Sequence, residues 1–210
     1  MSRNNYDLLA PYYDFICTLV YGKNILRIQE ELLQYIPPNM SLLLVGGGNG
    51  KILKSIEKLS ISNLKITYIE ASKKMVELSR KNGAGLENVE YLAQYLEDAH
   101  LTEQFDYIFT PFFFDNFQLE KIEFLFSNLD KHLKKEGIWL YADFNVTATK
   151  KNYWNAFLLK TMYLFFKIVS KIETQELIYL RPIFEKNNYQ LQKEVFKYGQ
   201  FIYGQVYKKL

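Results

Sequence analysis

The sequence predicts a single α/β domain with a seven-stranded, mostly parallel sheet, an antiparallel strand near the C-terminus and helices on both faces. Three observations predict this fold. Apolar runs of strand length alternate with segments of helical periodicity, which is typical of a parallel sheet. A glycine-rich turn follows the first run, and two alternating segments joined by Tyr198-Gly199 end the chain as a hairpin. The 210 residues suffice for one domain with a sizeable core.

The expected strands are short runs rich in apolar residues. The first contains Leu42 to Val45 and has the pattern of a strand buried in a parallel sheet. The last two alternate apolar and polar residues, as hairpin strands do. In chain order we expect strands at 41–45, 64–69, 88–92, 105–110, 138–144, 189–197 and 200–208.

The expected helices are recognised by their spacing and by the residues that end them. Asn24 is the expected N-cap of the first helix, and Pro37-Pro38 ends it. Asn82-Gly83 and Lys135-Glu136-Gly137 end two others. In chain order we expect helices at 22–36, 51–59, 72–81, 119–134, 154–171 and 182–186.

The turn after the first strand is the most informative segment. It contains Gly46, Gly48 and Gly50, and a helical pattern follows. Glycine adopts φ > 0 easily and lets a ligand approach the backbone, while a helix N-terminus presents free N–H groups. A dinucleotide motif requires glycine where Lys51 stands, and a P-loop requires Ser or Thr after Gly50-Lys51. The turn therefore predicts a nucleotide-type cofactor site of another kind, with a plain connection as the alternative.

A carboxylate follows about twenty residues later, where Glu70 ends the strand at 64–69. At this spacing it can accept the hydrogen bonds of a ribose diol. The G-x-G-x-G turn and Glu70-Ala71-Ser72 together resemble motifs I and II of class I S-adenosylmethionine (SAM) methyltransferases. The resemblance implies SAM as cofactor, with the three glycines around it, Glu70 and Ala71 at the ribose and Met75 on the adenine. The alternatives are an exposed strand-end charge for Glu70 and a core position for Met75.

The N-terminal segment extends this resemblance. Tyr6 to Asp14 is similar to the leader of the ubiquinone/menaquinone group of small-molecule methyltransferases. That leader folds over the cofactor, which implies Tyr13 near the amino-acid end of SAM and Tyr12 as a catalytic residue on the substrate side. Surface aromatics on a first helix are the alternative. The Rossmann-like domain of this family would span 1–210, divided into an N-terminal helical cap (1–38), a cofactor-binding core (39–145), an inserted apolar lid helix (150–180) and a C-terminal helix with hairpin (181–210).

Three further positions follow from the resemblance, and one departs from it. Gln94 and Tyr95 lie where the family often binds the adenine amino group, and Thr110 would line the floor beneath the sulphonium. Asp106 is expected to be structural. Leu44 stands where the family usually has an acid that organises the amino-acid end of SAM. This change implies weaker affinity, a substitute from the leader, or a pocket no longer used for SAM.

Aromatic residues, 17% of the chain, cluster where a substrate would bind. Phe112-Phe113-Phe114 follows the fourth strand, and the helix at 154–171 is apolar except for a narrow lysine strip. We interpret this helix as a lid over an apolar or aromatic acceptor; a dimer surface, a peripheral membrane contact or a core helix are the alternatives. Asp115 and Asp143, at the ends of neighbouring strands, are expected to orient a hydroxyl or amine of the acceptor, or else to cap loops.

Composition excludes several classes of function. A net charge of +3 without a basic stripe argues against a nucleic-acid partner, and no His/Cys/Asp cluster has metal-ligand spacing. A single cysteine and no signal-peptide pattern predict a cytoplasmic protein.

These observations together predict SAM-dependent methyl transfer to a small, largely apolar or aromatic acceptor. O- or C-methylation is favoured, because Thr110-Pro111-Phe112-Phe113 matches the [DNS]-P-P-[YF] motif of amino-group methyltransferases poorly. The alternative is a non-catalytic module that binds a partner or a membrane surface through its aromatic helix.

Overall fold

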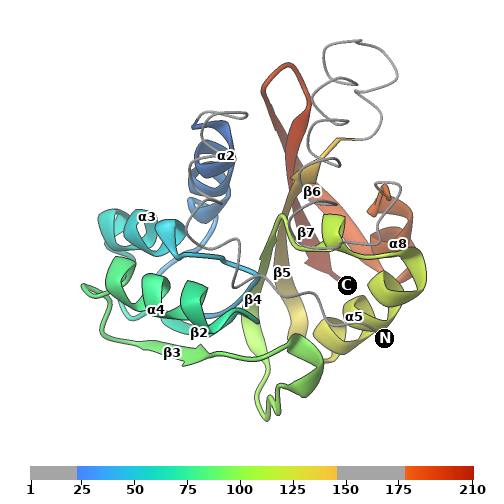
Figure 1. The fold of residues 1–210 in the computed structure, drawn as a ribbon. Helices are drawn as coiled ribbons and strands as arrows, with labels where there is room; N and C mark the ends of the chain where they lie inside the picture. The colour runs from blue at the N-terminus through green and yellow to red at the C-terminus, as the bar shows by residue number, and fades with distance from the viewer. Residues whose placement is uncertain (1–22, 146–177) are drawn as a thin grey trace.

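A computed structural model describes residues 23–145 and 178–210 of the chain. The expected leader, with Tyr12 and Tyr13, and the expected helix at 154–171 lie outside these residues. The described strands form one seven-stranded sheet in the order β3-β2-β1-β4-β5-β7-β6. Helices cover both faces of this sheet (Figure 1). The predicted fold class is therefore confirmed.

The elements follow the expected order. The expectation that Lys135-Glu136-Gly137 ends a helix was wrong, because α5 ends at Lys131 and these residues lie inside β5. The strands are β1 (Ser41–Val45), β2 (Lys65–Ile69), β3 (Val89–Leu92), β4 (Phe105–Pro111), β5 (Leu133–Phe144), β6 (Tyr189–Lys197) and β7 (Ile202–Lys209). The helices are α2 (Asn24–Leu33), α3 (Lys51–Leu59), α4 (Lys73–Asn82), α5 (Leu119–Lys131) and α8 (Arg181–Lys186), with 3-10 turns η1 (Leu96–Asp98) and η2 (Phe114–Asn116). The expectation for Asn24 was wrong, because it is the first residue inside α2, whose N-cap Lys23 makes no side-chain cap hydrogen bond.

The sheet brings the carboxyl ends of β1, β2, β4 and β5 to one edge. These strands are parallel neighbours, so their carboxyl ends lie together. β7 runs antiparallel to β5, and β6 completes the hairpin at the border of the sheet. Strand order reverses between β1 and β4, and ligands of open α/β sheets bind at such a point. The glycine turn after β1 lies there.

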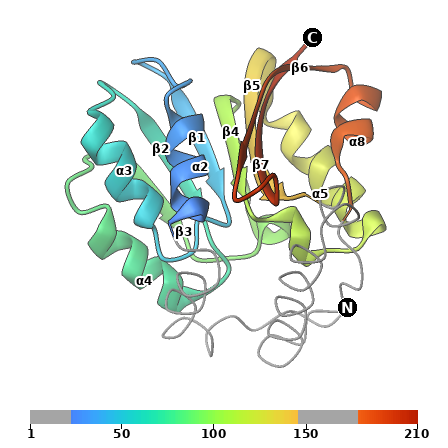
Figure 2. The same cartoon turned by 90° about the horizontal axis from the view of Figure 1, so that it is seen from above.

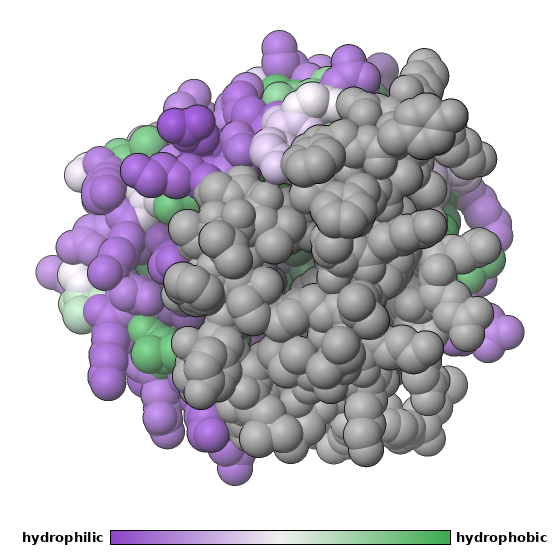
Figure 3. Space-filling model, turned by 45° about the horizontal axis from the view of Figure 1, so that its top comes forward, coloured by the Kyte–Doolittle hydropathy of each residue, from purple (hydrophilic) through white to green (hydrophobic). Residues whose placement is uncertain are grey.

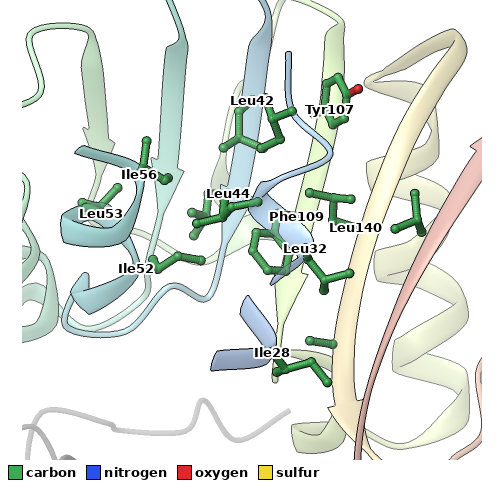
Figure 4. Packing of buried hydrophobic residues seen from close by; sticks show 14 of the residues in the cluster. Ile28, Leu32, Leu42, Leu44, Ile52, Leu53, Ile56, Tyr107, Phe109 and Leu140 are labelled. Carbon is green, nitrogen blue, oxygen red and sulfur yellow. The ribbon is translucent and has the colours of Figure 1, made fainter. Parts of the chain in front are cut away.

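One face of the sheet is covered by α2 and α3 (Figure 2). Ile28 of α2 and Ile52 of α3 are buried on this face with Leu44 of β1 and Phe109 of β4 (Figure 4). Leu44 has no exposed surface. Its apolar side chain is therefore part of the core. An acidic side chain at the same position would be buried there and would need a partner for its charge.

The other face is covered by α5 and α8, and its core is largely aromatic. The Trp139 ring stacks on Phe126 with centroids 4.7 Å apart, and Phe184 stacks on Tyr207 at 3.9 Å. Phe114 is also 1% exposed within this cluster. The expectation that Phe114 lines a substrate site was wrong, since its ring packs beneath the sheet edge. Much of the high aromatic content thus builds a core.

Asp106 fastens the edge of the sheet opposite the glycine turn. The Ser41 backbone N–H and hydroxyl donate to its Oδ2 at 2.9 and 2.7 Å, and Lys134 Nζ donates to Oδ1 at 2.7 Å. Partial burial raises the pKa of Asp106, but these hydrogen bonds outweigh it and lower the pKa overall. The contacts agree with the expected structural role.

Hydrophilic side chains dominate the coloured part of the surface in Figure 3. Large exposed apolar side chains come from separate elements, such as Leu59 of α3 and Phe124 of α5. Within 23–145 and 178–210, no helix is long and apolar enough to cross a membrane.

Candidate active site

The glycine turn has the left-handed backbone that its sequence predicts. Gly46, Gly48 and Gly50 have φ of +73°, +61° and +77°. The Gly46 N–H donates to the Ile69 carbonyl at 2.9 Å, which continues the β1–β2 ladder into the turn. Gly50 is the N-cap of α3. The turn therefore carries the chain directly from the end of β1 into the free N–H groups of a helix.

The three glycines are required for different reasons. A Cβ on Gly50 would lie 2.6 Å from the Cα of Ser79, so this glycine allows α3 to approach α4. A Cβ on Gly46 would lie 2.9 Å from Cδ2 of Phe113. Among residues 23–145 and 178–210, a Cβ on Gly48 would meet nothing within 4 Å. Only Gly48 of these three presents an open side, which is where a ligand can approach the backbone.

A fourth glycine, Gly47, was not singled out from the sequence. A Cβ on it would lie 2.5 Å from Cδ2 of Leu44 and from the hydroxyl oxygen of Tyr68. These two side chains are neighbours in the register of β1 and β2. They fill the space beneath the turn, and the run Gly46-Gly47-Gly48 is the sequence signal that could have indicated this crowding.

Glu70 lies directly against the turn. Its Oε2 accepts from the Gly48 N–H at 3.1 Å and its Oε1 accepts from the Ser72 N–H at 2.9 Å. The residue is 9% exposed. The sequence prediction placed Glu70 and the glycines in one site, and the structure brings them together. The carboxylate also joins the turn to the start of α4, because Ser72 is the N-cap of that helix.

The other residues expected at the cofactor follow β2 and β3. Ala71 is half-buried between Glu70 and Ser72, and Met75 is 4% exposed in the first turns of α4. Gln94 and Tyr95 are both half-buried after β3, and Tyr95 is the N-cap of η1. All four therefore lie after β2 or β3, on the Glu70 side of the turn.

Thr110 is placed differently from the other expected cofactor residues. It has no exposed surface, and its hydroxyl accepts from Trp139 Nε1 at 2.9 Å. Its side chain thus faces the aromatic core beneath α5.

Asp115 and Asp143, the two expected catalytic carboxylates, lie together at the ends of β4 and β5. Asp143 is 3% exposed, and its Oδ2 accepts from the Tyr141 hydroxyl at 3.0 Å. Tyr203 in turn donates to the Tyr141 hydroxyl at 3.1 Å. The backbone N–H of Asp115 donates to the Asp143 carboxylate. Neighbouring strand ends thus place both aspartates in one polar cluster.

Burial shifts the titration of this pair. It raises the pKa of Asp143 from 3.8 to about 7, against the opposing effect of hydrogen bonds from Phe144 and Tyr141. Burial, and then the charge of Asp143, raises the pKa of Asp115. Two close carboxylates cannot both ionise easily, so the pair retains a proton near neutral pH.

Phe112 and Phe113 direct their rings to opposite faces at the end of β4. Phe112 has φ of +51°, unusual for a bulky residue, and its N–H donates to the Ala142 carbonyl at 2.8 Å. Its ring lies 5.0 Å from that of Phe144, whereas the Phe113 ring lies 5.1 Å from that of Phe117. Such a strained residue is characteristic of a functional loop.

No group of three His, Cys, Asp or Glu side chains in the described part of the chain is arranged to hold a metal ion.

Comparison with known proteins agrees with this site. Residues 43–139, from β1 into β5, match the family model described as a methyltransferase domain. A search of curated protein sequences found no match.

Solved structures share the fold at low sequence identity. A SAM-dependent methyltransferase from Aquifex aeolicus is 19% identical, with a TM-score of 0.64 over 96% of this chain and 97% of that one. Magnesium protoporphyrin IX methyltransferase from Synechocystis PCC 6803, with bound SAH, is 12% identical, with a TM-score of 0.65 over 95% and 88%. The N-methyltransferase NodS from Bradyrhizobium japonicum WM9 is 10% identical, with a TM-score of 0.62 over 91% and 97%.

The fold and the glycine–carboxylate site agree with the class I methyltransferase fold that the resemblance in the sequence implied. Residues 43–139 thus match a methyltransferase domain, and solved SAM-dependent methyltransferases share the fold, which agrees with an enzyme of this kind that uses S-adenosylmethionine.

Proposed function

We propose that the chain transfers the methyl group of SAM to a small, largely apolar or aromatic acceptor, at oxygen or carbon. The observation that carries this proposal is the open, left-handed backbone of Gly48 beside Glu70. It lies where the strand order of the sheet reverses, between β1 and β4. A ligand that lies on the turn would there meet a bare peptide, a buried carboxylate and the N-terminus of α3.

Glu70 and the turn would hold the cofactor. Gly48 offers its uncovered backbone, and Glu70 is placed to accept ribose hydroxyls while it fastens the turn, because a carboxylate accepts up to about four hydrogen bonds. Met75, Gln94 and Tyr95 are proposed on the adenine side. When bound, SAM supplies a methyl group activated by a sulphonium, so alignment of the acceptor contributes most of the rate.

Asp115 and Asp143 are proposed to orient the acceptor. They lie at the carboxyl edge of the sheet, next to the strained Phe112. A pair that retains one proton can donate one hydrogen bond and accept another, which suits a hydroxyl group. The rings of Phe112 and Phe113, which point to opposite faces, would each provide an apolar contact near this polar pair.

Oxygen or carbon is favoured over nitrogen as the methylated atom. The amino-group methyltransferase motif begins with Asp, Asn or Ser, and the corresponding Thr110 hydroxyl is bonded to Trp139. Its third position is proline, where this chain has Phe112 in a left-handed conformation that proline cannot adopt. NodS is an N-methyltransferase of the same fold, so amines belong among the acceptors tested.

The test is a methyl-transfer assay with methyl-labelled SAM and a panel of phenols, quinols, aliphatic alcohols and aromatic amines. We expect label to enter at least one phenol or quinol, and Asp143→Asn to lower this turnover at least tenfold while SAM affinity is unchanged. Asp106→Asn is the matched control, since that aspartate lies at the opposite edge of the sheet. Label entering only amines would contradict the proposed acceptor class, and equal turnover in both variants would contradict the role of Asp143.

A further inference from the structure

The methyltransferase resemblance implies an acidic residue at position 44, two residues before the glycine turn, but this chain has leucine there. Leu44 occupies that position, fully buried, and offers no hydrogen bond through its side chain. Its neighbour in the register of β2 is Tyr68, which is also fully buried. Both side chains reach the space under Gly47. Any side-chain hydrogen bond from this pair to the turn must therefore come from Tyr68.

Tyr68 makes that hydrogen bond to the glycine with the open side. Its hydroxyl donates to the Gly48 carbonyl at 2.8 Å. Burial, and then the charge of Glu70, raises the pKa of Tyr68 well above its ordinary value. The hydroxyl consequently remains protonated and keeps its donor role at neutral pH.

Gly48 is thus fixed through both of its polar backbone groups. Its N–H donates to Glu70 at 3.1 Å and its carbonyl accepts from Tyr68 at 2.8 Å. Both partners come from β2 or its end, so one strand determines how the Gly48 peptide is oriented. Because glycine loses more conformational freedom on ordering than any other residue, these bonds lower the free-energy cost of presenting the turn to a ligand.

We propose that Tyr68 is a positioning residue for SAM, whose hydroxyl holds the Gly48 peptide in the conformation that binds the cofactor. This inference rests on the proposed role of the glycine turn in cofactor binding. It also explains how the site functions with Leu44 at the position of the usual acid. The hydrogen bond that holds the turn comes from Tyr68 of β2, the strand next to β1.

The chain provides a matched control for the test. Tyr107 lies in the same core as Tyr68, is 8% exposed, and donates its hydroxyl to a backbone carbonyl, that of Tyr35, at 2.9 Å. The Tyr107 hydroxyl therefore bonds the end of α2, whereas the Tyr68 hydroxyl bonds the glycine turn after β1. Tyr68→Phe and Tyr107→Phe each remove one oxygen from a buried ring, so a purely structural role predicts similar losses of stability and no difference in SAM affinity.

The experiment measures SAM binding by calorimetry and stability by urea unfolding for the wild type and both variants. We expect Tyr68→Phe to bind SAM about five- to tenfold more weakly, the value of one neutral hydrogen bond, and Tyr107→Phe to bind like the wild type. Equal SAM affinity in both folded variants would overturn the role of Tyr68 and leave the proposed function intact. Absence of SAM binding in the wild type would overturn the proposed function itself.

A measurement on the unliganded wild type keeps the inference testable if Tyr68→Phe does not fold. Hydrogen exchange at the Gly48 and Gly50 amides reports on how firmly the turn is held, because these N–H groups donate to Glu70 and to the Gly47 carbonyl. We expect both amides to be protected in the absence of SAM. Exchange as fast as in an unstructured loop would show that the turn is not held in advance, and would overturn the proposal.

Discussion

Alanine at Gly48 and at Gly50 separates ligand binding from helix packing within one turn. Both residues have left-handed backbones, with φ of +61° and +77°. A new Cβ on Gly48 would extend into open space, whereas one on Gly50 would lie 2.6 Å from the Cα of Ser79 in α4. The same substitution therefore tests two different reasons for a glycine.

The magnitudes follow from these surroundings. A left-handed conformation costs a non-glycine residue about 1–2 kcal/mol, and this is the whole expected loss of stability for Gly48→Ala. For Gly50→Ala the overlap with Ser79 requires α3 and α4 to separate, which adds about 1–3 kcal/mol. In a chain of this size each kcal/mol lowers the melting temperature by about 2–4 °C.

Urea unfolding and SAM calorimetry on both variants provide the assay. We expect Gly48→Ala to remain within about 2 kcal/mol of the wild type in stability but to bind SAM at least tenfold more weakly, because its methyl group occupies the ligand's approach. We expect Gly50→Ala to be the less stable of the two. Unchanged SAM affinity in Gly48→Ala, or equal stability of the two variants, would refute this account of the turn.

Three further predictions concern residues outside the turn. Because the pKa of Asp143 rises from 3.8 in the unfolded chain to about 7 in the folded one, the folded state binds the extra proton, and stability should fall by up to about 4 kcal/mol as pH rises from 4 to above 7. Urea unfolding at several pH values should show this slope in the wild type. Because burial raises the pKa of Asp115 as well, a slope of the same size in the variant with both Asp115→Asn and Asp143→Asn would contradict its source. Asp106→Ala should lower the free energy of unfolding by about 2–4 kcal/mol, because it removes the hydrogen bonds that Ser41 and Lys134 donate to a charged carboxylate, and SAM affinity should stay unchanged. An unchanged melting temperature would count against the structural role of Asp106. Thr110→Val should lower the free energy of unfolding by about 1–3 kcal/mol, because Trp139 Nε1 is left without its acceptor. A large loss of SAM affinity at unchanged stability would instead place Thr110 at the cofactor.

The fold and the centre of the site could be predicted from local patterns. The run from Leu42 to Val45, the glycines after it and Glu70 at the end of the next strand are features of single segments, and parallel strands bring their ends together. The same rule predicted that Asp115, after β4, and Asp143, near the end of β5, both face this edge of the sheet, where the two strands are neighbours.

The remaining features depend on contacts between distant segments. Glycine is required at position 50 because Ser79 of another helix packs against it. The hydroxyl of Tyr68, a β2 residue, donates to the Gly48 carbonyl in the turn after β1. Periodicity marks Tyr68 only as a buried strand residue. Aromatic content suggested a substrate site, yet composition cannot distinguish a binding surface from the core that contains Phe114 and Trp139.

The most direct test of the central claim is a calorimetric titration of the wild-type chain with SAM, with Glu70→Ala and Gly48→Val as variants. The account predicts one molecule of SAM bound per chain, displaced by SAH, and binding lost in both variants while they remain folded. A folded wild type that binds no SAM, or binding that persists unchanged in both variants, would contradict it.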